Sequence, residues 1–196
     1  MAERYPGYDV LAKWRSPSFD DTTRAVLRQR LATVPARRFL APAEWELLEA
    51  LAARLMPQPD RAEPIPITPW IDAMLVEGVG DGYRRDGWPG LRETWRMGLA
   101  AIEDEARIAA AGGFAAMDAD AQDALLARIQ RGEVRSPQWQ QLPPAHFFGM
   151  LLRTVAAIYY SHPAAWSEIG FGGPASPRGY VRLGFDEQDP WEAHDR

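Results

Sequence analysis

The sequence contains no cysteine, and this absence excludes several classes of function. Without a thiol the chain forms no disulfide, offers no thiolate nucleophile and supplies no cysteine ligands to zinc or to an iron–sulfur cluster. Lysine is almost absent too, because Lys13 is the only one in the chain and arginine supplies the remaining basic charge. Neither absence identifies a cellular compartment, since a chain without cysteine suits oxidising and reducing surroundings equally.

The chain also lacks an excess of positive charge and any long apolar run. It has 22 Lys+Arg against 27 Asp+Glu, a net charge of −5, which argues against a nucleic-acid binder with a basic face. No stretch approaches the roughly 20 apolar residues that a transmembrane helix needs. The pair Arg37-Arg38 lies too far into the chain for an export signal, and acidic residues follow it. We therefore expect a cytoplasmic protein, or a periplasmic one if a partner exports it.

Alternating strand patterns are missing as well, whereas helical periodicity recurs along most of the chain. Helices are expected in six places: about 22–34 after Asp21-Thr22-Thr23, from Pro42 to the prolines at 57 and 59, 69–78, from Trp88-Pro89-Gly90 to about 111, 118–131 and 144–160. A Pro-rich linker is expected at 57–69. The sequence thus predicts an all-α fold, a bundle of about six helices forming a domain over 22–161.

The two ends of the chain have no such period. Residues 1–21 are expected to form an irregular arm that packs through its aromatics, and residues 162–196 an extended tail rich in Gly, Pro and aromatic residues. The tail contains large rings that are costly to leave in water, among them Trp166, Phe171 and Trp191. We infer that the tail lies against a surface, either its own bundle or a partner chain.

Recognisable catalytic motifs are absent from the sequence. It contains no HExxH, GxSxG or GxGxxG, its GVGDG run lacks the strand and the lysine of a phosphate loop, and its three histidines lack metal-ligand spacing. The residues alone therefore indicate no enzyme. Two alternatives remain: a free-standing helical enzyme using His146 or His162 with a carboxylate such as Glu168, and a helical module that binds a small molecule between its helices.

Two stretches resemble a known family. They are Phe39-Leu40 through EWELLEALAARLMP, and Phe147-Phe148 through LLRTVAAIYYSHPAAWSEIGFGGP, with its paired Phe, Tyr-x-x-x-Pro step and Ile-Gly-Phe-x-Gly-Pro run. Over roughly 39–174 the chain resembles the gluconate 2-dehydrogenase subunit 3 family, the small subunit of FAD-dependent sugar and polyol dehydrogenases. The resemblance implies a non-catalytic subunit that binds and stabilises a flavoprotein of the glucose–methanol–choline (GMC) type, which oxidises a sugar, polyol or glycoside. It further implies that the FAD lies in that partner, that this chain binds no cofactor, and that a cytochrome or another electron acceptor joins the complex.

The second stretch and the tail after it supply the expected contact with the partner, because aromatic residues and arginine are the usual anchors of interfaces. For the first half of the last helix, Phe147 included, a place in the core is the favoured interpretation. The candidate interface residues are Phe147, Phe148, Tyr159, Tyr160, His162, Trp166, Phe171, Gly172, Gly173, Pro174, Arg178, Tyr180 and Phe185.

Overall fold

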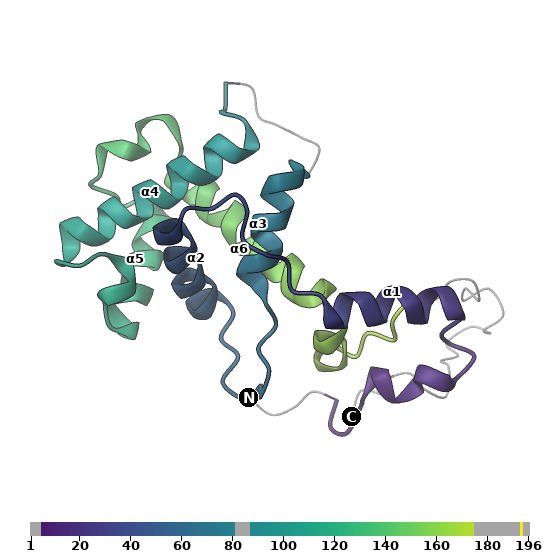
Figure 1. The fold of residues 1–196 in the computed structure, drawn as a ribbon. Coiled ribbons are helices and arrows are strands. Elements are labelled where there is room, and N and C mark those ends of the chain that lie inside the picture. The colour runs from purple at the N-terminus through teal and green to yellow at the C-terminus, as the bar shows by residue number, and fades with distance from the viewer. Residues whose placement is uncertain (1–4, 81–86, 175–192, 194–196) are drawn as a thin grey trace. The chain divides into compact units, whose positions relative to one another are not determined.

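A computed structural model describes residues 5–80, 87–174 and 193. Within these ranges every regular element is a helix, which confirms the all-α prediction (Figure 1). The α-helices are α1 (Asp21–Ala32), α2 (Pro42–Leu55), α3 (Ile67–Glu77), α4 (Leu91–Ala109), α5 (Ala119–Arg131) and α6 (Pro144–Ser161). Four short 3₁₀ helices accompany them: η1 (Val10–Arg15), η2 (Phe114–Ala116), η3 (Pro137–Gln141) and η4 (Pro163–Ile169).

The chain divides into two compact units. Residues 34–158 form one unit, called here the central unit, and residues 1–33 together with 159–196 form the other, called the terminal unit. Helix α6 begins in the central unit and its last three residues belong to the terminal unit. The expected division into arm (1–21), helical domain (22–161) and tail (162–196) cuts the chain elsewhere and stays a prediction.

Local sequence signals account for most helix ends. Asp118 caps α5 by accepting a hydrogen bond from the backbone N–H of Ala121 at 2.8 Å, as expected, and Gly132 ends that helix in the left-handed conformation. Two starts differ from expectation. Helix α1 is capped by Asp20, one residue earlier than predicted. Helix α3 begins at Ile67 because proline is tolerated in a first turn, where its missing N–H costs nothing.

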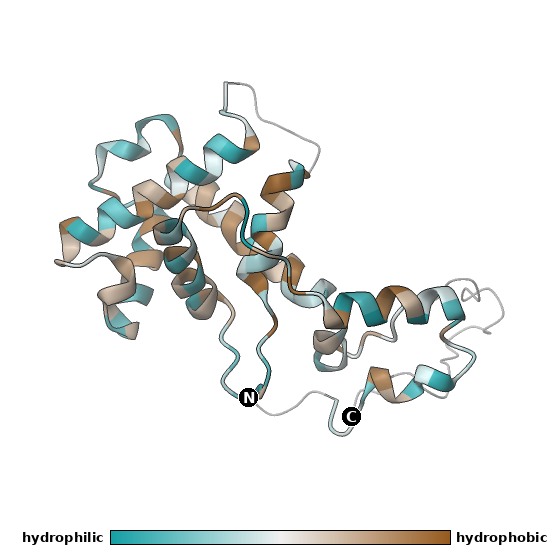
Figure 2. Ribbon diagram, in the orientation of Figure 1, coloured by the Kyte–Doolittle hydropathy of each residue, from teal (hydrophilic) through white to brown (hydrophobic). Residues whose placement is uncertain are grey.

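A close approach between α4 and α6 organises the core of the central unit. The Phe147 ring is fully buried and makes edge contacts with Trp95 at 6.0 Å, and a tilted contact with Trp139 at 6.2 Å. Gly98 of α4 lies directly beneath this ring, and a Cβ there would overlap three of its atoms. Apolar stretches are prominent on α3 and along α6 (Figure 2). The expectation that the first half of α6 is core is therefore confirmed.

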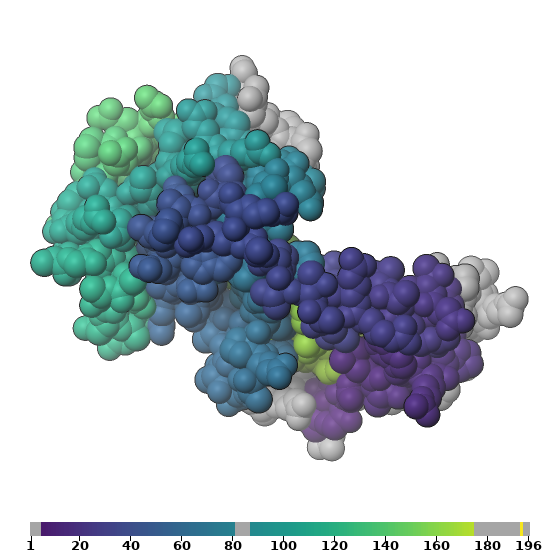
Figure 3. Space-filling view, viewed as in Figure 1, coloured from purple at the N-terminus to yellow at the C-terminus, as the bar shows by residue number. Residues whose placement is uncertain are grey.

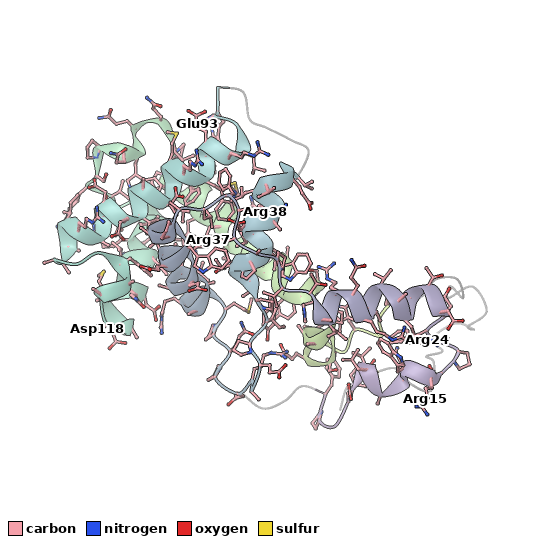
Figure 4. All side chains as sticks on the ribbon, viewed as in Figure 1. Arg15, Arg24, Arg37, Arg38, Glu93 and Asp118 are labelled. Carbon is pink, nitrogen blue, oxygen red and sulfur yellow. The ribbon has the colours of Figure 1, made fainter. Side chains whose placement is uncertain are left out.

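A buried carboxylate fixes the segment that leads into α2. Asp72 of α3 is fully buried, and its two oxygens accept hydrogen bonds from the backbone N–H groups of Arg38, Phe39 and Leu40 at 2.7–3.3 Å. The side chains of Arg37 and Arg38 are on the surface of this segment (Figure 4), and the Phe39 ring receives the guanidinium of Arg96 at 4.5 Å. The acid thus satisfies three backbone donors that would otherwise be left without partners.

A second buried acid joins α4 to the segment before η3. Glu105 is almost wholly buried and accepts hydrogen bonds from the backbone N–H groups of Arg135 and Ser136. Arg128 of α5 completes its surroundings with an ion pair at 3.4 Å. Glu105 is thus an internal anchor, whose two backbone donors lie about thirty residues further along the chain.

Candidate functional site

The expected interface begins where α6 ends, in the terminal unit. His162 follows Ser161 in an extended conformation, and its Nδ1 accepts a hydrogen bond from the Ala164 N–H at 3.4 Å, so it caps the 3₁₀ helix η4. Pro163 occupies the first position of η4, where a missing N–H is harmless. Gly170 then ends η4 in the left-handed conformation. The Tyr-x-x-x-Pro and Ile-Gly-Phe steps are thus the signals that start and stop one short helix.

Aromatic side chains connect the end of α6 to η4 and the residues after it. The Trp166 indole N–H donates to the Tyr160 carbonyl at 3.0 Å, and the Phe171 ring meets the Trp166 ring edge-on with centroids 5.2 Å apart. Tyr159 packs edge-on against Tyr160 at 5.0 Å, and its hydroxyl donates to the Glu168 carboxylate at 2.9 Å. These contacts fix the geometry of the segment without help from another chain.

The N-terminal part of the terminal unit covers much of this segment. Val10, Phe19, Leu27 and Trp166 form a small buried cluster, against which Tyr8, Leu11 and Trp14 pack. The described part of the expected irregular arm, residues 5–21, therefore contains the helix η1. It also shares a core with Trp166 of the expected tail. Beside this core, hydrogen bonds from the side chain and from the backbone N–H of Thr23 lower the pKa of Asp20 below its ordinary value, and the backbone bond, at 2.7 Å, caps the start of α1.

Arginine side chains brace the N-terminal part. Arg24 donates to the carbonyls of Trp14 and Phe19 and forms an ion pair with Asp21 at 2.8 Å, and it therefore ties α1 to the turn that precedes it (Figure 4). Arg28 places its guanidinium over the Trp14 ring at 5.4 Å. Both arginines therefore have packing and bonding roles within the terminal unit.

The candidate interface residues differ in how far their side chains are exposed to solvent. Buried members are Phe147, Phe148, Tyr159, His162, Trp166 and Gly173, and half-buried ones are Gly172 and Pro174. Tyr160 and Phe171 are the exposed rings of the set, at 38% and 42% of their full surface. Arg178, Tyr180 and Phe185 lie outside the described residues. Whether any member contacts a partner stays a prediction, and the exposed rings are the members that could do so without rearrangement.

The histidines that might have formed a catalytic site have other surroundings. His146 is exposed at the start of α6, with its ring 5.8 Å from that of Trp88, and His162 is the helix cap described above. Within residues 5–80, 87–174 and 193, no three His, Asp or Glu side chains gather in a way that could hold a metal ion. In the same residues no helix combines the length and apolar character that crossing a bilayer requires.

Sequence reasoning missed the residues that hold the expected interface in place. Ser167 accepts a hydrogen bond from the Val10 N–H at 3.1 Å, Lys13 donates to the Gly172 carbonyl, and Arg30 donates to the Ser161 hydroxyl at 2.6 Å. Their partners are more than 130 residues away along the chain, so no periodicity reveals them. The sequence offered one indication of these contacts: Lys13 is the single lysine of the chain, and it lies in a segment rich in aromatic residues.

Comparison with known proteins adds one finding. A family model described as gluconate 2-dehydrogenase subunit 3 matches residues 42–173, about two thirds of the chain. The match begins at the first residue of α2 and ends at Gly173. It therefore includes the helices of the central unit and residues 159–173, called here the Trp166 segment, but not η1 or α1. No curated protein and no solved structure matches the chain.

Proposed function

This chain belongs to the gluconate 2-dehydrogenase subunit 3 family, and from that membership we propose that it is an accessory subunit of a sugar-oxidising dehydrogenase complex. Its task is to bind and stabilise a larger catalytic subunit of the GMC type, which holds FAD and oxidises a sugar, sugar acid, polyol or glycoside. The chain itself contributes neither flavin nor catalytic groups. Electrons pass from the flavin to a cytochrome or another acceptor outside this chain. The family match over the central unit and the Trp166 segment is the observation that supports this proposal most.

The exposed rings near the end of α6 support a contact surface in this complex. The Phe171 ring meets the ring of buried Trp166 edge-on, and the Tyr160 ring meets that of buried Tyr159 in the same way, while the Trp166 indole N–H donates to the Tyr160 backbone carbonyl. Rings held rigid by a buried neighbour lose little side-chain entropy when a partner covers them, which is why aromatic residues dominate interface energetics. We propose that these two rings contact the catalytic subunit.

Co-expression with the flavoprotein tests the accessory role. The catalytic subunit, expressed with and without this chain, is purified through a tag on the catalytic subunit, and its soluble yield and bound FAD are measured by absorbance. We expect the two chains to co-purify and the soluble, FAD-loaded fraction to fall when this chain is omitted. If the flavoprotein folds, loads FAD and oxidises its substrate equally well alone, and does not retain this chain, the proposal is wrong.

Matched variants test the contact surface. Phe171→Ala and Tyr160→Ala should weaken retention of the chain by the catalytic subunit. Ile108→Ala is the control, because Ile108 is an exposed apolar residue of the central unit, at 45%, with no part in the proposed surface. Equal effects of all three variants would show that the two rings have no special role. His146→Ala serves as a second control, since loss of dehydrogenase activity in that variant alone would favour the catalytic alternative.

A further inference from the structure

Three arginines of the central unit lie together and have no part in the aromatic contact proposed above. Arg37 and Arg38 precede α2 and are labelled in Figure 4, Arg96 belongs to α4, and all three are exposed. The guanidinium of Arg96 lies over the ring of Phe39, 4.5 Å from its centre, and so joins α4 to this segment. In the space-filling view the dark blue segment before α2 lies on the face shown and borders the teal atoms of α4 (Figure 3). We call Arg37, Arg38 and Arg96 the arginine patch.

The acidic side chains that bond to this segment are engaged with its backbone and not with its arginines. Asp72 and Glu44 accept hydrogen bonds from the four consecutive backbone N–H groups of residues 38–41. Glu93 lies three residues before Arg96 on α4, a spacing that allows an ion pair, yet Arg96 lies over the Phe39 ring instead. Within the part of the chain that the structure describes, no guanidinium of the patch has a carboxylate partner or donates a hydrogen bond.

The patch is also held in place before any partner arrives. Asp72 is fully buried and fixes the backbone of residues 38–40, and the half-buried Phe39 ring supports the guanidinium of Arg96. A guanidinium that rests on a ring is already oriented, so it loses less freedom when it forms hydrogen bonds. Its planar fork of N–H donors matches the two oxygens of a carboxylate. The patch is therefore suited to binding carboxylate groups.

The charge of the whole chain narrows the class of partner. Its net charge is −5, so an extended polyanion such as a nucleic acid or an anionic bilayer is repelled by the protein as a whole. Segments that bind anionic lipids have roughly 4–8 basic residues, more than the patch supplies. A short acidic segment on a protein surface requires only local complementarity, which three arginines provide.

We propose that the arginine patch binds a short acidic segment on the surface of the catalytic subunit, through hydrogen bonds from the guanidinium groups to carboxylates. This proposal rests on the proposed function and adds a second contact to it. Charged contacts chiefly speed association and fix the orientation of two proteins, whereas buried rings supply most of the affinity. The patch thus orients the chain on the flavoprotein, and Tyr160 and Phe171 supply the apolar contact.

Surface plasmon resonance with the full chain and the purified catalytic subunit tests the patch. The double variant Arg37→Glu/Arg96→Glu should raise Kd at least about tenfold, mainly through slower association, and should reduce the dependence of Kd on salt. Both residues are exposed, so circular dichroism should show the same helix content and thermal midpoint as in the wild-type chain.

A single charge reversal at another exposed arginine is the matched control. Arg135 also belongs to the central unit, and its backbone N–H bonds to Glu105, about 14 Å along α4 from Arg96 and beyond the screening length at physiological salt. Arg96→Glu alone should therefore raise Kd more than Arg135→Glu does, and equal effects would contradict the patch. Arg96→Lys keeps the charge without the fork, so it should also raise Kd, but by less than Arg96→Glu. An unchanged Kd in Arg96→Lys would refute the paired hydrogen bonds.

Two further outcomes separate this proposal from its alternatives. Vesicles of phosphatidylcholine and phosphatidylserine should not sediment with the chain, and binding that the double variant abolishes would make a lipid surface the occupant and overturn the proposal. If the wild-type chain binds the catalytic subunit and the double variant binds it equally well, the patch has no role while the accessory function stands. If the wild-type chain does not bind the catalytic subunit at all, the proposed function fails and this contact fails with it.

Discussion

Replacing Gly98 by alanine tests the packing of the central unit, because two physical effects predict opposite signs. In the interior of an exposed helix, alanine is more stable than glycine by about 1 kcal/mol. At this position in α4, however, a Cβ would lie less than 3.0 Å from three atoms of the Phe147 ring. The ring is fully buried against Trp95 and Trp139, so it has little freedom to move away.

The magnitude follows from these two terms. Overpacking a filled core costs about 1–3 kcal/mol, and overlap with a rigid ring places this case near the upper end. After the gain of about 1 kcal/mol in helix propensity, the free energy of unfolding should fall by about 2 kcal/mol. Gly149→Ala in α6 is the matched control, because the atom that crowds its Cβ site belongs to the flexible end of Arg153. That variant should gain stability or stay neutral.

Urea unfolding followed by far-UV circular dichroism measures both variants, with unchanged m-values confirming that the same surface is exposed. Phe147→Leu provides a second test, because the smaller side chain makes room for the added methyl group. The double variant should then be more stable than the sum of the single changes implies, by about 1 kcal/mol or more. If Gly98→Ala stabilises the chain as Gly149→Ala does, the described contact between α4 and α6 is wrong.

Three further predictions concern carboxylates. Asp72→Asn should lower the free energy of unfolding by about 2–3 kcal/mol, because the N–H₂ group of the new amide then faces a backbone N–H donor in the segment 38–40. Thermal unfolding measures this loss, and an unchanged stability would contradict the role of Asp72 in fixing that segment. Glu105→Gln should cost about 1–3 kcal/mol for the same reason, whereas exposed Glu49→Gln should be neutral in the same assay. Asp20, whose pKa is lowered in the folded chain, stabilises α1 above its unfolded pKa, and this contribution is lost as pH falls through the folded value. The stability difference between wild type and Asp20→Asn should therefore shrink on acidification, and a difference that stays constant through the acid range would refute the capping role.

Much of the helical framework could be predicted because its signals are local. Pro42 marks the start of α2, Asp118 and Gly132 bracket α5, and the first half of α6 was expected in the core. The start of α3 was misplaced because Pro69 was interpreted as a boundary, although proline fits equally well inside a first turn. Such errors of one or two residues reflect how little free energy separates alternative helix ends.

Long-range contacts could not be predicted in the same way. The sequence gives no sign that Asp72 is buried and bonded, because its partners are backbone N–H groups, which every residue type except proline supplies. Trp166 was expected to need a covering surface, which is correct, but its cover is Val10, Phe19 and Leu27 at the other end of the chain. A single sequence shows that a ring needs burial, whereas only the tertiary structure identifies the neighbour that buries it.

The construction of the terminal unit from both ends of the chain has a consequence for biosynthesis. Residues 5–32 leave the ribosome before the central unit, but their apolar partner Trp166 is translated only after the whole of that unit. Domains generally fold as they emerge, so Phe19 and Leu27 must wait in water or on a chaperone while the central unit is made. Closure of the terminal unit then follows the folding of the central unit, and nascent chains that stall before Trp166 present the uncovered side chains of Phe19 and Leu27 to proteolysis and quality control.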